Sequence, residues 1–282
     1  MRRQVKAQGL YEAGHYYSPI PSEDEINTEV SDVLSASLES DINLRADEQV
    51  ALVQDFAQFH DEIPFRDEKG EGEGRYYYNQ PWFCHSDAIM LYCMIRKFQF
   101  KKIVEVGSGF SSAVMLDTTE RFGPKDCEFT FVEPYPDRLN DLVDVEKQAN
   151  VTLVQDFVQK VDLEIFKSLD EGDLLFIDSS HVVKYQSDLH YLMFVVLPLL
   201  KKGVIVHFHD VFYPFEYPED WLKEGRFWNE CYLLRAFLTG NSNWEIVLFN
   251  HYMNEVHGEV VEKSVPLCRK NYGGSFYLRK LA

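Results

Sequence analysis

The 282-residue sequence has no hydrophobic run long enough to cross a membrane. Its longest apolar stretch, around residues 191–200, is shorter than the roughly 20 residues of a transmembrane helix, and it contains Pro198. No apolar segment follows Arg2 and Arg3, so a signal peptide is not expected. We therefore expect neither a membrane partner nor export.

Cysteine and positive charge are also scarce. The five cysteines are an odd number and none has C-x-x-C spacing, which indicates reduced thiols in a cytoplasmic protein. The 28 lysines and arginines stand against 46 aspartates and glutamates, giving a formal net charge of -18. Because such an acidic surface repels phosphate backbones, bulk nucleic acid is not expected as a partner.

Short apolar segments alternate with stretches of helical spacing through most of the chain. Five of them are nearly continuously apolar, as strands buried on both faces are: residues 103–106, 129–132, 151–154, 174–177 and 204–206. This alternation predicts an α/β fold with a doubly wound, Rossmann-like and mostly parallel sheet. Residues 244–249 and 275–279 are two further strand candidates near the end of the chain.

The N-terminal part follows a different pattern. Residues 46–60 have helical spacing, and a polar stretch containing glycines follows, so we expect an arm and helical cap over residues 1–80 and the main domain over 81–282. Prolines stiffen the aromatic segment at residues 14–21. We expect this arm to fold back over the strand ends, with Tyr16 or Tyr17 beside the substrate. The alternatives are a packing arm on a distant face and a contact within a homodimer.

Polar residues follow the C-terminal ends of all five predicted strands, which is where open α/β sheets bind ligands. The first strand ends in Glu105-Val106-Gly107-Ser108-Gly109, and glycine lets backbone approach a ligand closely. The next strand ends in Glu133, a carboxylate that can accept both hydroxyls of a ribose. Asp156 and Phe157 follow the third strand, and a carboxylate beside a ring suits an adenine.

As a set, these motifs resemble those of class I S-adenosylmethionine-dependent methyltransferases, over about residues 84–282. The resemblance implies that Glu105 and the glycine turn face the methionine part of the cofactor, Glu133 the ribose, and Asp156 with Phe157 the adenine. The cofactor-binding residues that it implies are Glu105, Gly107, Ser108, Gly109, Ser111, Glu133, Asp156, Phe157 and Asp178.

Two strands that should be neighbours end in Asp178-Ser179-Ser180-His181 and His207-Phe208-His209-Asp210. This pattern is similar to a subgroup of O-methyltransferases that includes macrocin-type sugar-modifying enzymes. The resemblance implies Asp178 and Asp210 as ligands of a divalent metal and His181 as the catalytic base. His209 stands where that subgroup has an acidic residue, and imidazole suits zinc, iron or manganese better than magnesium. The metal set would be Asp178, His209 and Asp210, and either the metal differs or none is bound. His207, within the strand, is expected to be a packed core histidine.

An aromatic stretch after Asp210 is where an acceptor pocket would lie, with Tyr213, Trp221 and Arg226 as candidate contacts. A surface loop packed by its own rings is the alternative. The resemblance implies methylation of a hydroxyl on a small molecule or sugar. A nicotinamide-dependent oxidoreductase is a second hypothesis, although Ser112 occupies the third glycine position of the dinucleotide motif. A non-catalytic Rossmann-like binding module is a third.

Overall fold

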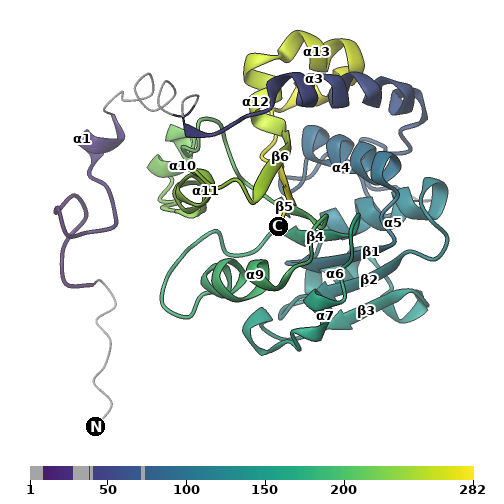
Figure 1. The fold of residues 1–282 in the computed structure, drawn as a ribbon, viewed down its shortest axis with the longest axis horizontal. Helices are drawn as coiled ribbons and strands as arrows, with labels where there is room; N and C mark the ends of the chain where they lie inside the picture. Colours follow the sequence, from purple (N-terminus) through teal and green to yellow (C-terminus); the bar gives the residue numbers. More distant parts are fainter. Residues whose placement is uncertain (1–8, 28–37, 39–40, 71–73) are drawn as a thin grey trace.

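The computed structural model describes residues 9–27, 38, 41–70 and 74–282. Seven strands form one sheet in the order β3-β2-β1-β4-β5-β7-β6 (Figure 1). Neighbours from β3 to β5 pair in parallel, whereas β7 is antiparallel to both β5 and β6. The strands are β1 (Lys102–Val106), β2 (Glu128–Val132), β3 (Val151–Val154), β4 (Leu174–Ile177), β5 (Ile205–Phe208), β6 (Trp244–Phe249) and β7 (Phe276–Lys280). The predicted doubly wound, mostly parallel α/β fold is confirmed.

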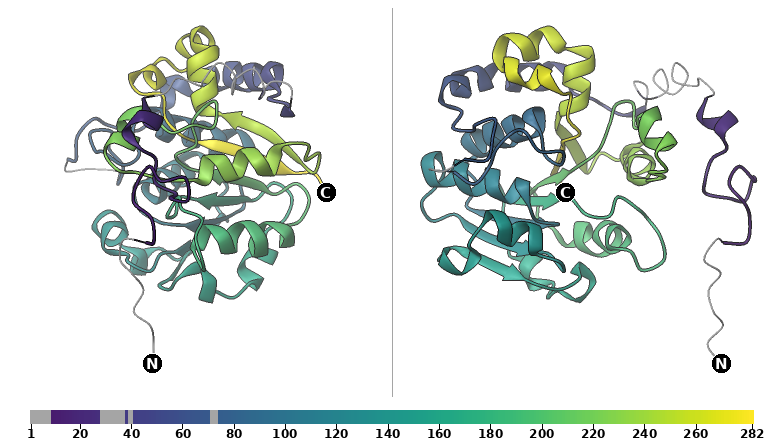
Figure 2. Two further views of the ribbon diagram at one scale, coloured as in Figure 1. Left: turned by 90° about the vertical axis from the view of Figure 1, so that its left-hand side faces the viewer. Right: turned by 180° about the vertical axis from the view of Figure 1, so that it is seen from behind.

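Helices connect the strands and cover the sheet. The longer ones are α3 (Ala46–Asp55), α4 (His85–Phe98), α5 (Phe110–Phe122), α11 (Glu230–Leu238), α12 (Asn250–Val256) and α13 (Gly258–Ser264). The shorter ones are α1 (Glu23–Ile26), α6 (Asp137–Leu142), α7 (Glu164–Lys167), α8 (Asp188–Tyr191), α9 (Leu197–Leu199) and α10 (Glu219–Lys223). Single turns of other helix types are η1 (Phe56–Glu62), η2 (Val145–Lys147), η3 (Val158–Lys160), η4 (Leu192–Val196) and η5 (Pro266–Lys270). In Figure 2, right, α4 and α5 lie on the opposite side of the molecule from α9 to α11. No described helix has both the length and the apolar content for a membrane span.

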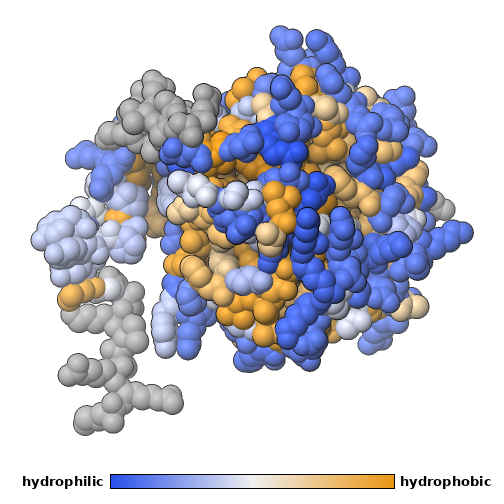
Figure 3. Space-filling model, viewed as in Figure 1, coloured by the Kyte–Doolittle hydropathy of each residue, from blue (hydrophilic) through white to orange (hydrophobic). Residues whose placement is uncertain are grey.

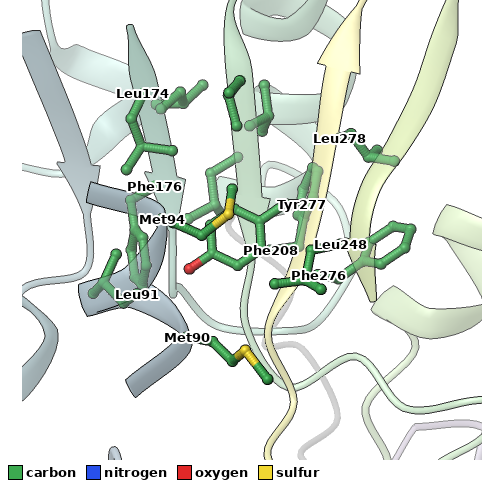
Figure 4. Close-up of a cluster of buried hydrophobic side chains, with 14 of the residues drawn as sticks. Met90, Leu91, Met94, Leu174, Phe176, Phe208, Leu248, Phe276, Tyr277 and Leu278 are labelled. Atoms are coloured by element: carbon green, nitrogen blue, oxygen red, sulfur yellow. The ribbon is translucent and has the colours of Figure 1, made fainter. Parts of the chain in front are cut away.

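The core lies between the sheet and the helices. Met90, Leu91 and Met94 of α4 lie close to Phe176 of β4 and Phe208 of β5, and all five are fully buried (Figure 4). Fully burying a side chain of this size contributes roughly 1.5–3 kcal/mol relative to leaving it exposed. This packing makes the sheet a rigid support, so the residues at its strand ends are held in defined positions.

The predicted helical cap packs into the same core, away from the strand ends. Helix α3 contacts α13 and β6, and Val53 and Phe56 are fully buried. Gln49 accepts a hydrogen bond from the backbone N–H of Phe249 at 2.6 Å, and Arg45 pairs with Glu245 at 2.7 Å. The domain boundary near residue 81 stays a prediction, but the core runs across it.

The described part of the arm, residues 9–27, stands apart from the sheet near α10 (Figure 1). The ring of His15 stacks between those of Tyr11 and Tyr16, and Tyr16 and Tyr17 are 81% and 65% exposed. Figure 3 shows the arm extending from a face where hydrophilic side chains surround smaller apolar areas. The prediction that the arm covers the strand ends is therefore wrong for this structure.

Candidate active site

A cavity of about 350 Å³ opens at the C-terminal ends of β1, β4 and β5. Its wall on one side is the turn between β1 and α5, residues 107–111. The opposite wall comes from the strand ends after β4 and β5, with Trp228 beside them. Trp82 and Phe83, just before α4, and Glu133 and Arg138, after β2, complete the lining. The structure thus brings segments together that are far apart in the sequence.

The glycine turn is built for close backbone packing. Gly107 has a φ of 84°, and its N–H donates to the carbonyl of Val132 at 3.0 Å. A Cβ at this position would lie 1.7 Å from the carbonyl oxygen of Asp178. Only glycine fits here, because a side chain would push apart the ends of β1 and β4. Ser108, Gly109 and Ser111 follow it along the cavity wall.

Glu105 supports this turn from below. It is fully buried and accepts hydrogen bonds from the hydroxyls of Ser111, at 2.6 Å, and Ser112. Burial raises the pKa of Glu105 to about 8, although these hydrogen bonds oppose the change. Glu105 does not line the cavity. The two serines bind its carboxylate beneath the turn, and the expected contact between Glu105 and the methionine part of the cofactor stays a prediction.

A second cavity, of about 330 Å³, adjoins the first, and the two share Gly107, Glu133 and Asp178 in their linings. Glu133 accepts hydrogen bonds from the N–H groups of Ser108, at 3.1 Å, and Tyr135, at 2.8 Å. Phe157 lines the second cavity and packs edge-on against Tyr135, with ring centroids 5.9 Å apart. Glu133 and Phe157 thus line the same cavity, and their predicted contacts with a ribose and an adenine stay predictions.

Asp156 differs from this expectation. Its carboxylate pairs with Lys160 at 3.1 Å and accepts a hydrogen bond from the N–H of Phe157 at 2.8 Å. It lines neither of the two cavities. Lys160 lies one helical turn further on, and its charge competes with any ligand for this carboxylate. The predicted contact of Asp156 with an adenine stays a prediction, made less favourable by this ion pair.

His181 is surrounded by three carboxylates. Its Nδ1 lies 2.8 Å from Oε2 of Glu230, and its Nε2 lies 3.5 Å from Oδ1 of Asp178 and 3.6 Å from Oδ2 of Asp210. The ring packs against Trp228 with centroids 4.4 Å apart. The backbone of His181 and Asp210 has a positive φ, 57° and 56°. Such a conformation is uncommon for residues other than glycine and is often found at functional sites.

This surrounding charge determines how the groups titrate. Burial acts to lower the pKa of His181, but its contacts with Asp178 and Glu230 raise that pKa well above the usual value. Burial acts to raise the pKa of Asp178, but His209 and His181 outweigh it and lower that pKa. Burial raises the pKa of both Asp210 and Glu230. The cluster therefore favours a positive charge on His181.

Glu230 was not among the predicted site residues. It begins α11, its side chain is 1% exposed, and its Oε1 has no hydrogen-bond partner among the described residues. A signal for it exists in the sequence. Glu230 lies four residues before Leu234, next to the apolar stripe of the helix, so a carboxylate there faces the interior. A buried carboxylate needs a partner, and His181 is that partner.

The candidate metal ligands do not fit a metal ion. Among the residues that the structure describes, no three histidine, cysteine or carboxylate side chains converge as ligands. Nε2 of His181 lies between the carboxylates of Asp178 and Asp210 instead. His209 lines the cavity with its Nε2 3.6 Å from Asp210. His207 is fully buried with its ring stacked on Phe176 at 3.7 Å, so the prediction of a packed core histidine is confirmed.

The candidate acceptor residues lie outside the cavity. Tyr16 and Tyr17 lie on the arm, and Tyr213 packs against Tyr252 at 5.1 Å. Trp221 packs edge-on against Trp228 at 5.3 Å, and Arg226 stacks on Trp221 at 4.5 Å. The aromatic stretch after Asp210 is thus packed by its own rings, which was the alternative to an acceptor pocket in the sequence analysis. The aromatic lining of the cavity consists of Trp82, Phe83, Phe110 and Trp228. Trp228 belongs to the aromatic stretch in which the sequence predicted an acceptor pocket, whereas the other three were not predicted.

Residues 104–211 match a family described as a methyltransferase domain. An uncharacterized protein of Archaeoglobus fulgidus is 29% identical over 168 residues, which cover 58% of this chain and 75% of that protein.

Solved structures at lower identity are also similar. The O-methyltransferase TomG from Streptomyces achromogenes, in complex with SAM, is 16% identical, with 93% of this chain and 100% of that one covered and a TM-score of 0.43. The SAH-bound methyltransferase PaMTH1 of Podospora anserina is 15% identical, with coverage of 94% and 99% and a TM-score of 0.44. The matched segment 104–211 contains the glycine turn, Glu133, Asp178, His181 and Asp210, so this part of the chain is similar to a methyltransferase domain.

Proposed function

We propose that this enzyme transfers the methyl group of S-adenosylmethionine to a hydroxyl oxygen of a small-molecule acceptor, with His181 as the general base. The observation that carries the proposal is the setting of His181. A buried carboxylate, Glu230, holds one ring nitrogen at 2.8 Å, and the ring lines the cavity beside Asp178 and Asp210. A base held by a third group in this way is typical of sites that remove a proton from a hydroxyl.

Glu230 fixes which nitrogen of His181 carries the proton in the neutral ring. A carboxylate accepts hydrogen bonds, so Nδ1 keeps its hydrogen and Nε2 has the free lone pair. The acceptor hydroxyl would donate to Nε2 while its oxygen attacks the methyl carbon in line with the sulfur. The C–O bond forms as the S–CH₃ bond breaks, and the hydroxyl proton passes to Nε2.

The three carboxylates would hold one positive charge throughout this reaction. Before transfer the charge lies on the sulfonium of the cofactor, and after transfer it lies on the imidazolium of His181. Without ligand, the carboxylates raise the pKa of His181 and favour its protonated form. A sulfonium placed beside Asp178 would oppose that second positive charge, so cofactor binding would release the proton and make His181 a base.

The cofactor would occupy both adjoining cavities. Its methionine part would lie along Gly107 to Ser111, its ribose hydroxyls would donate to Glu133, and its adenine would pack on Phe157. Glu105 would act through the turn that it supports, and Asp156 through its pair with Lys160. No step needs a divalent metal, since the carboxylates that would bind one already contact His181.

The test supplies S-adenosylmethionine with a panel of phenolic and sugar-hydroxyl acceptors and measures S-adenosylhomocysteine by mass spectrometry. His181→Gln should lower kcat by roughly two to four orders of magnitude, with little change in the Kd of the cofactor. His190→Gln is the control, because His190 is exposed and lines neither cavity. Wild-type turnover by His181→Gln would show that another group removes the proton.

A further inference from the structure

Arg138 is the one lysine or arginine among the described residues that line the cavity at the ends of β1, β4 and β5. The same lining contains three carboxylates, those of Glu133, Asp178 and Asp210. These negative charges suit the sulfonium and the ammonium group of the cofactor, which are both positive. They repel its third charged group, the carboxylate of the methionine part. A bound cofactor therefore needs a cation for that carboxylate.

Arg138 is available for this task. Among the described residues it has no ion pair or hydrogen bond, and its guanidinium stacks on the ring of Trp82 with Cζ 4.0 Å from the ring centroid. Arg226 provides a contrast, since it stacks on Trp221 at 4.5 Å and also pairs with Glu224 at 2.8 Å. Arg138 makes no ion pair among the described residues, although its charge is near enough to Asp178 to help lower the pKa of that carboxyl.

The position of Arg138 matches the glycine turn. A Cβ built on Gly109 would lie 3.0 Å from Cδ of Arg138, so the aliphatic stem of the arginine lies directly on this glycine. Gly109 precedes α5, a helix of 13 residues, and the N–H groups in the first turn of a helix have no partners within it. Such N–H groups attract anions. The guanidinium thus lies beside a second feature that favours negative charge.

The two cavity histidines are less suited to a carboxylate. His181 already contacts Glu230, Asp178 and Asp210. His209 lies beside Asp210 at 3.6 Å. An incoming carboxylate near either ring would meet these acids, whereas Arg138 lies on the opposite wall with the glycine turn.

We propose that Arg138, held by stacking on Trp82, binds the carboxylate of the methionine part of the cofactor. This inference rests on the proposed use of S-adenosylmethionine. A guanidinium donates two parallel hydrogen bonds to a carboxylate, which fixes the direction of the bound group as well as its charge. The methionine chain would then run from Arg138 across the glycine turn, with the sulfonium toward Asp178 and His181.

The experiment compares two ligands that differ only in this group. Decarboxylated S-adenosylmethionine keeps the adenosine, the sulfonium and the ammonium group but lacks the carboxylate. Calorimetry would measure the Kd of both ligands for the wild type, Arg138→Gln and Arg138→Lys. The wild type should bind S-adenosylmethionine about 10- to 100-fold more tightly than the decarboxylated ligand. Arg138→Gln should lose most of this preference, with less than about a twofold change for the decarboxylated ligand.

Control variants separate the possible outcomes. Arg138→Lys keeps the charge but loses the paired geometry, so it should retain part of the preference. Arg226→Gln removes a stacked arginine outside the cavity and should bind both ligands as the wild type does. Equal losses for the two ligands in Arg138→Gln, or no loss, would overturn the proposal. Unchanged cofactor affinity with a raised KM for the acceptor would also overturn it and assign Arg138 to the acceptor. If the wild type binds neither ligand, the use of S-adenosylmethionine itself has failed.

Discussion

Replacing Glu230 with glutamine tests the orientation of His181 while keeping the shape of the side chain. The carboxylate of Glu230 lies 2.8 Å from Nδ1 and its side chain is 1% exposed, so the bond is made out of water. A hydrogen bond to a charged group contributes about 1.5–3 kcal/mol and a neutral one about 0.5–1.5 kcal/mol. The difference of roughly 1–2 kcal/mol corresponds to about a 5- to 30-fold loss in kcat.

A larger loss is expected if the amide of the new glutamine turns. Its NH₂ group would then donate to Nδ1, and the proton of the neutral ring would move to Nε2. This tautomer has no lone pair facing the cavity. The equivalent change in a catalytic triad lowers kcat about 10⁴-fold. We therefore expect a loss of between about 5-fold and 10⁴-fold, measured as S-adenosylhomocysteine formed under saturating ligands.

The pH dependence of kcat/KM for the cofactor provides a second readout, because it reports the free enzyme. The carboxylates raise the pKa of His181, so in the wild type the neutral base appears only as the pH rises, and kcat/KM should increase toward alkaline pH. Removing the charge of Glu230 lowers this pKa, and the rise should move to lower pH. Glu216→Gln is the control, because Glu216 is a partly buried carboxylate outside the cavity. Wild-type kcat with an unmoved pH midpoint in a folded Glu230→Gln would refute the reasoning.

Three further predictions follow from the geometry. Glu133→Gln should weaken S-adenosylhomocysteine binding about tenfold in calorimetry, whereas Asp156→Asn should change it less than about threefold. Equal losses of affinity would show that Asp156 contacts the adenine after all. Exhaustive chelation should leave turnover unchanged, because Nε2 of His181 lies between the candidate metal ligands. A loss of turnover that added manganese or magnesium restores would contradict this prediction. Deleting residues 1–21 should preserve turnover and the KM of the acceptor, since the tyrosines of the arm lie outside the cavity. A strong rise in this KM would instead support the arm as a lid.

Strand identity could be predicted because buried parallel strands have a plain signature. Residues 103–106 and 174–177 are almost entirely apolar and are followed by glycine or aspartate, and both became strands, β1 and β4. The order of the last two strands had no such signal. β7 lies between β5 and β6 and is antiparallel to both. Apolar content says that a strand is buried, but not which neighbour it pairs with.

The helical cap shows a related limit. An amphipathic stripe at residues 46–60 predicts a helix with one buried face, and α3 does bury Val53. The stripe does not state what covers it, and the partner proved to be α13 and β6 rather than the strand ends. That contact depends on Gln49 and Arg45, whose partners lie about 200 residues away in the sequence.

Which carboxylates reach a ligand depends on competition among neighbouring groups. Glu105, Glu133 and Asp156 all follow or end a parallel strand, and from the sequence they were equivalent candidates. In the structure the two serines at the start of α5 donate hydrogen bonds to Glu105, and Lys160 forms an ion pair with Asp156. Within the described part of the chain, the hydrogen-bond partners of Glu133 are backbone N–H groups, so it keeps free lone pairs toward the cavity.

Part of that competition was readable in advance. Lysine four residues after Asp156 has the spacing of a helical ion pair, and two serines at the start of the helix after Glu105 are local hydrogen-bond donors. For Arg138 this reading fails: Asp141, three residues on, has the spacing of a helical ion pair, but among the described residues Arg138 pairs neither with it nor with the adjacent Asp137. A charged residue whose local partners are absent or unused is therefore a better site candidate than one at a matching motif position. By this criterion Glu133 and Arg138 rank above Glu105 and Asp156 as residues that touch the cofactor.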